Sequence, residues 1–89
     1  LDIATSLQEE ISLAFDAGNG YEHVIVLPSS ILGREYSIIT EGTTLNIKTD
    51  DGDYALSVPI MSVTGFFTSG TNVIRNVNGV VFVNYAEDN

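Results

Sequence analysis

The sequence predicts a mainly β domain with one short N-terminal helix, and three observations support this fold class. Residues 6–17 have the spacing of polar and apolar residues that is typical of a helix. The rest of the chain divides into short runs of β-branched and aromatic residues, which favour strands. Pairs of Asp, Asn or Ser with Gly separate several of these runs and predict tight turns. We therefore expect a helix followed by an antiparallel β meander that forms a small sandwich or prism.

The helix is expected over residues 6–17. Ser6 and Glu9 have the spacing of a capping box, and Gly18 is a suitable stop. Apolar residues at 3-4-3 spacing also admit a heptad interpretation; they are Ala4, Leu7, Ile11 and Ala14. Two alternatives follow: a short coiled-coil stem that joins three chains, or a single helix packed on the domain's own sheet. The expected division of the chain is an N-terminal helical stem and linker over residues 1–20 and a β-structured head domain over residues 21–89.

The strands are expected to follow one another with short connections. Their ranges are 23–27, 35–40, 43–49, 53–58, 60–67, 71–77 and 80–86. Asp51-Gly52 and Asn78-Gly79 are two-residue hairpin signals, because Gly and Asn tolerate the positive φ that such turns need. Pro28 is expected to end the first strand.

Several of these strands are apolar on consecutive residues, as in Val24–Leu27 and Val80–Val83. A strand with one face in water alternates apolar and polar residues, so both faces of these strands require burial. Either the strands close on themselves or neighbouring subunits cover the second face. The candidate interface residues are Leu7, Ile11, Ala14, Val24, Val26, Ile38, Phe66 and Phe82.

Length, charge and residue usage exclude several classes of function. An 89-residue chain makes one small domain, which usually needs a disulfide, a metal or a partner subunit for stability. The chain has no Cys and one His, so oligomerisation is the route left open. Three Lys and Arg against twelve Asp and Glu give a net charge of −9, which argues against nucleic acid and anionic membranes as partners. No apolar run approaches the ~20 residues of a membrane span, no signal peptide is recognised, and the start at Leu1 suggests a fragment.

No catalytic set is recognised, and we expect neither an enzyme nor a cofactor. His23 is the single His and lies beside a Gly-rich linker, while nucleophilic catalysis needs a base and a group that orients it. Residues 49–54, TDDGDY, offer carboxylates that a calcium ion could use, but the EF-hand spacing is not met. A hairpin corner explains this segment without an ion.

The tyrosines are the candidate surface contacts. Tyr21, Tyr36 and Tyr54, with Tyr85, could stack on sugars if they are exposed. The alternative is that they pack at strand edges or between subunits with their hydroxyl groups in water.

Short motifs follow one another from Val24 to Tyr85. They are Leu27-Pro28, Gly33-Arg34 with Tyr36 and Ile38, Glu41-Gly42, Thr44–Ile47, Gly52-Asp53, Gly70-Thr71, and Asn78-Gly79 before Phe82 and Tyr85. This series resembles a β-structured module of bacteriophage fibre, spike and head-decoration proteins. The resemblance implies a homotrimeric structural protein of the virion, an extracellular particle. Its implied partners are other virion or capsid proteins and a host-surface glycan. The alternative is a monomeric β-sandwich that binds carbohydrate or a cell surface.

Overall fold

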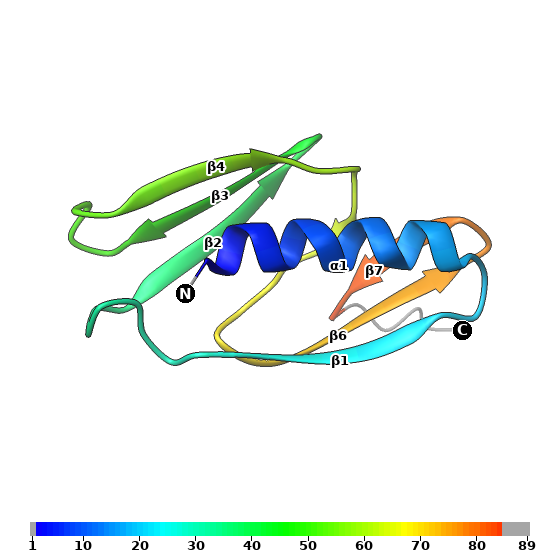
Figure 1. Cartoon of the computed structure of the whole chain (residues 1–89), viewed down its shortest axis with the longest axis horizontal. Coiled ribbons are helices and arrows are strands. Elements are labelled where there is room, and N and C mark those ends of the chain that lie inside the picture. The colour runs from blue at the N-terminus through cyan, green and yellow to red at the C-terminus, as the bar shows by residue number, and fades with distance from the viewer. Residues whose placement is uncertain (1, 85–89) are drawn as a thin grey trace.

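The computed structural model of this chain describes residues 2–84 and confirms that the fold is mainly β (Figure 1). The described residues form one helix and seven strands. Their bounds are α1 (Ile3–Ala17), β1 (Glu22–Leu27), β2 (Tyr36–Glu41), β3 (Thr44–Thr49), β4 (Ala55–Pro59), β5 (Thr64–Gly65), β6 (Gly70–Val77) and β7 (Val80–Val83). The strands form two separate sheets, so the antiparallel meander expected from the sequence is found only in β2, β3 and β4.

Helix α1 begins three residues earlier than the sequence predicted, because Asp2 caps it. The Asp2 carboxylate accepts hydrogen bonds from the Thr5 N–H at 3.1 Å and the Thr5 hydroxyl at 2.7 Å. These bonds also lower the pKa of Asp2. The predicted capping box is therefore wrong, since Ser6 already lies inside the helix. Gly18 ends the helix with φ 84°, as its sequence position indicated.

One face of α1 is buried by both sheets of the chain. The buried residues are Ile3, Ala4, Leu7, Ile11 and Ala14. The helix contacts β3 and β4 of one sheet and β6 and β7 of the other, and it runs along the space between them (Figure 1). The helix is thus the packed helix of the second alternative. Helix α1 is not separated from the strands as a stem would be, because helix and strands share one hydrophobic core.

The smaller sheet has the strand order β2-β3-β4. Leu45 and Ile47 are 0% and 1% exposed, Lys48 is exposed and Thr49 is buried, so successive side chains of β3 point to opposite faces of the sheet. Ile38 lies opposite Ile47 and belongs to the same core. Gly42, with φ 56°, provides the turn from β2 to β3.

The larger sheet has the strand order β1-β6-β7-β5, which brings the first strand beside the sixth. Asn78 and Gly79 join β6 to β7 with φ values of 53° and 89°, which confirms the predicted hairpin. The predicted strand at residues 60–67 is reduced to two residues, and they run parallel to β7. Gly65 is required there, since a Cβ at this position would lie 1.9 Å from the Val83 carbonyl oxygen.

Candidate functional site

The outer face of the larger sheet is the main exposed apolar surface that the strands form. The inner face packs on α1 through residues such as Ile74 and Val81, which are almost fully buried. Side chains alternate along each strand, so the neighbours of these residues point away from the helix. Val24, Val26 and Val80 on this outer side are 52%, 72% and 46% exposed.

An apolar row crosses this outer face from β1 to the end of β5. Val24 lies directly opposite Val73 of β6. The Asn84 N–H donates to the Val73 carbonyl at 2.8 Å, and the Asn84 side chain donates to the Phe66 carbonyl at 2.8 Å. Phe66 is 73% exposed, whereas the adjacent Phe67 is buried, as expected for residues on opposite faces. We call Val24, Val26, Val73, Phe66 and Val80 the outer apolar face.

Charge is sparse on this side of the strands. Glu22 of β1 lies opposite Arg75 of β6, and Arg75 lies opposite Phe82 of β7. Phe82 is half-buried. The opposite charges face one another, so the outer side of β1, β6 and β7 carries little of the chain's net charge of −9.

The structure divides the eight candidate interface residues into two groups. Val24, Val26, Phe66 and Phe82 lie on the outer side of the larger sheet. Leu7, Ile11 and Ala14 are 0% exposed and Ile38 is 8% exposed, because the chain's own helix and sheets cover them. These four residues have almost no surface left for a contact with a second subunit. Sequence reasoning could not separate the groups, because all eight residues are apolar.

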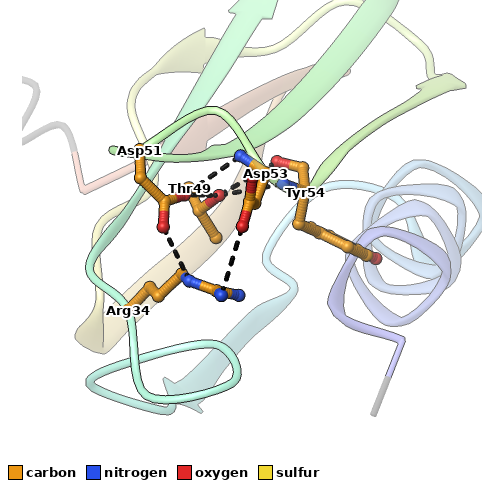
Figure 2. Close-up of polar contacts among 5 residues, drawn as sticks. All are labelled: Arg34, Thr49, Asp51, Asp53 and Tyr54. Atoms are coloured by element: carbon orange, nitrogen blue, oxygen red, sulfur yellow. Dashed lines mark hydrogen bonds and ion pairs between the residues drawn. The ribbon is translucent and has the colours of Figure 1, made fainter.

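A cluster of polar residues closes the loop between β3 and β4 (Figure 2). The Arg34 Nε lies 2.6 Å from the Asp51 carboxylate, and Arg34 Nη2 lies 3.2 Å from the Asp53 carboxylate. The hydroxyl of Thr49, a fully buried residue, donates to Asp51 at 2.9 Å and accepts from the Tyr54 N–H at 3.0 Å. Arg34 comes from the loop between β1 and β2, so this cluster holds two loops together.

The same cluster answers the question of a calcium loop. The Asp53 N–H, the Thr49 hydroxyl and then Arg34 lower the pKa of Asp51, all by favouring its charged form. Asp51 and Asp53 thus both face a guanidinium group, which takes the place that a cation would need. Among residues 2–84 no group of three His, Cys, Asp or Glu side chains has the geometry of a metal site. The segment is a corner between two antiparallel strands, as the sequence interpretation favoured, but the connection covers residues 50–54, so the two-residue hairpin predicted at Asp51-Gly52 is wrong.

The loop between β1 and β2 presents an apolar tip at one end of the long axis. Ile31 and Arg34 exchange two backbone hydrogen bonds of 2.8 and 2.9 Å around Leu32 and Gly33. Leu32 has a φ of 53°, a conformation that costs a non-Gly residue about 1–2 kcal/mol, and it is 75% exposed. Beside it, Tyr54 and neighbouring residues line an open cavity of about 280 Å³. Figure 1 places this loop and the β3–β4 loop at the same end of the molecule.

The three candidate tyrosines are half-buried against the core. The Tyr36 hydroxyl donates to the Pro28 carbonyl at 2.6 Å, and burial raises the pKa of Tyr36. The Tyr21 hydroxyl lies 3.1 Å from His23 Nδ1, and burial, followed by the charge of Glu10, raises the pKa of Tyr21. Tyr54 is the one of the three that lines the cavity at the tip. Tyr85 lies outside the described residues.

Buried asparagines are the polar residues that sequence reasoning missed. Asn72 accepts from the Thr68 N–H at 2.8 Å and from the Asn84 side chain at 2.7 Å. Asn76 donates to the Ala14 carbonyl at 2.9 Å and so closes the end of α1. Asn72 and Asn76 are separated by an even number of positions on β6, so their side chains point to the same face of the strand. This spacing was the signal in the sequence that could have identified them.

Comparisons of this chain with protein families, with curated proteins and with solved structures find no match. Within residues 2–84 the helix is too short and too polar to cross a membrane.

Proposed function

We propose that this protein is a non-enzymatic structural module that assembles with copies of itself through the outer apolar face. The main support for the proposal is that only one of the two sides of the larger sheet is covered by the chain itself. Its inner side is covered by the chain's own helix, while Val26 and Phe66 on the outer side are 72% and 73% exposed. Large apolar side chains that share one exposed face are typical of a protein interface.

The energy available from this face is close to the cost of association. Burying what remains exposed of Val24, Val26, Phe66 and Val80 contributes on the order of 5 kcal/mol per subunit. Loss of translational and rotational freedom costs about 4–15 kcal/mol. We therefore expect assembly to depend on concentration and to need contacts from more than one subunit pair, as a closed ring supplies.

Charge opposes assembly only at long range. Each chain carries −9, but the outer side of β1, β6 and β7 contributes just Glu22 and Arg75, which face one another. Repulsion then acts between distant surfaces, and salt screens it over about 10 Å at 0.1 M. Moderate salt should accordingly strengthen assembly.

The motif resemblance makes the proposal more specific: a trimeric fibre, spike or head-decoration module of a bacteriophage virion. The partners would be other virion or capsid proteins. The apolar tip at Leu32 and the cavity beside Tyr54 would then be a contact for the host surface. The same cavity favours the second candidate, a monomeric module that binds carbohydrate, because an aromatic wall suits a sugar ring.

Solution mass measured by light scattering over a range of concentrations tests the proposal. Assembly predicts a mass of three times 9.6 kDa, with a decrease on dilution. Phe66→Asp should give a monomer with an unchanged circular dichroism spectrum, because Phe66 is 73% exposed. Leu13→Asp is the matched control, since Leu13 is 49% exposed on α1, away from the outer apolar face. A monomer at all concentrations and salt levels would refute self-assembly, and glycan binding would then be screened.

A further inference from the structure

Strand β1 is an edge strand whose second side is open. It pairs with β6 only, and in the part of the chain that the structure describes no other strand lies along it. The Asn76 N–H donates to the Tyr21 carbonyl, and this bond shows which residues of β1 direct their backbone groups toward β6. Because backbone groups alternate in such a ladder, the N–H and C=O groups of Glu22, Val24 and Val26 face away from β6.

Within residues 22–27 this edge has no Lys, no Pro and no bulge. Natural edge strands carry Lys, Pro or a bulge, or they are covered. Residues 22–27 read Glu-His-Val-Ile-Val-Leu, and they form six continuous pairs with β6. A sheet edge of this kind accepts an extended segment through main-chain hydrogen bonds.

A groove runs beside the edge, between β1 and the first half of α1. Its volume is about 260 Å³, and its walls include Ile3, Ser6 and Glu10 from α1 with Ile25, Leu27 and Pro28 from β1 and its end. The groove is therefore apolar with one ionisable wall residue. An added strand would point alternate side chains into this groove and toward the outer apolar face.

Glu10 defines the chemistry of the occupant. Its Oε1 is shielded from water and accepts no hydrogen bond, while the side chain as a whole is 27% exposed and Glu10 is one of the residues that line the groove. The nearest group that could carry a positive charge is His23 Nδ1 at 3.4 Å, and this nitrogen also lies 3.1 Å from the Tyr21 hydroxyl. A buried carboxylate oxygen without a donor is costly, and Lys or Arg would satisfy it.

We propose that the β1 edge and this groove bind an extended segment of a partner protein, with a Lys or Arg side chain directed at Glu10. The net charge of −9 attracts a basic segment. The segment pairs with Glu22, Val24 and Val26, points β-branched residues toward the outer face and places its basic residue in the groove. This binding does not depend on self-assembly. Self-assembly also needs Phe66 and Val80, which lie at the other side of the sheet from the β1 edge.

The probe is a synthetic peptide, acetyl-Thr-Val-Lys-Val-Lys-Val-Thr-amide, titrated into the isotopically labelled chain. We expect saturable shifts in the backbone amide signals of Glu22, Val24 and Val26. Replacing both lysines of the peptide by glutamate should weaken binding at least tenfold. In Glu10→Gln this preference for lysine should fall at least threefold.

Two proline variants test which backbone N–H groups of β1 face away from β6. Val24→Pro removes an N–H that faces away from β6, so the chain should fold and lose peptide binding. Ile25→Pro removes an N–H that faces β6, so it should unfold β1. If Val24→Pro also fails to fold, a peptide methylated on its backbone nitrogens makes the same test on the intact chain.

Three outcomes would overturn the proposal. The first is the absence of shifts at these amides up to millimolar peptide, and the second is binding that survives Val24→Pro or backbone methylation. The third is pairing of the edge with a second copy, seen as shifts that grow with chain concentration without peptide. Phe66→Asp separates pairing of two β1 edges from assembly through the outer apolar face. The substitution disrupts that face and leaves the β1 edge intact, so shifts that persist in this variant come from edge pairing.

Discussion

Removal of the Asn76 side chain should destabilise the fold strongly, because it breaks a buried hydrogen bond to the Ala14 carbonyl and a part-buried one from Gly79. Asn76 is 2% exposed. Its amide donates to the Ala14 carbonyl at 2.9 Å, and its oxygen accepts from the Gly79 N–H at 2.9 Å. The Ala14 carbonyl would be left unsatisfied in a buried position at a cost of about 1–3 kcal/mol, and the part-buried bond from Gly79 contributes about 1 kcal/mol, so Asn76→Ala should lower the free energy of unfolding by roughly 3 kcal/mol. For a domain of this size that corresponds to a decrease in Tm of roughly 12–24 °C.

Urea denaturation followed by circular dichroism measures this loss. The matched control is Asn19→Ala, which also removes an Asn side chain near the same hairpin. The Asn19 oxygen accepts from the Asn78 N–H at 2.7 Å, but this bond is exposed, so water replaces it and the loss should stay below about 1 kcal/mol. Equal losses in the two variants, or a loss below about 1 kcal/mol in Asn76→Ala, would refute the assignment of Asn76 as the link between helix and hairpin.

Three further changes test other parts of the structure. Gly65→Ala should displace β5 from β7, since the new Cβ would lie 1.9 Å from the Val83 carbonyl oxygen, and a Tm unchanged in thermal melts would contradict that close approach. Leu32→Asn should raise the free energy of unfolding by about 1 kcal/mol in urea titration, because Asn tolerates the positive φ better; a loss would show that the Leu32 side chain stabilises the tip. The pKa of Asp51 is lowered from its ordinary 3.8, so its contribution to stability is present above that pH and is lost as pH falls through the folded pKa. Asp51→Asn should therefore lower the free energy of unfolding at pH 7, and this free energy should then decrease less on acidification than it does in the unsubstituted chain. Urea midpoints measured from about pH 7 to about pH 2 would show both effects.

Local features were predictable from the sequence because their energies depend on neighbouring residues. Gly18 ends the helix and Asn78-Gly79 forms the hairpin, since each needs a backbone conformation that these residues adopt readily. The positions of most strands followed from β-branched runs. The helix start was missed because two capping signals lie within a few residues of each other, and it is Asp2 whose side chain accepts a hydrogen bond, from the Thr5 N–H, so the helix begins before Ser6.

The candidate surfaces could not be predicted, because they depend on which strands pair. Val24 and Ile25 are adjacent, similar in size and both apolar, yet Val24 is 52% exposed while Ile25 packs against the core. Their faces are set by the pairing of β1 with β6, which joins residues such as Val24 and Val73 from distant parts of the chain.

The sequence by itself thus determined the type and approximate position of most elements, through periodicity, turn residues and a helix stop. The tertiary structure alone decided that α1 runs between two sheets, that its heptad-spaced residues are covered within the chain, and that β1 is an edge strand among residues 2–84. The physical reason is that burial of an apolar side chain is non-directional. Apolar runs favour a core without specifying their partner, and only the long-range competition among all strand pairings selects the face that remains exposed.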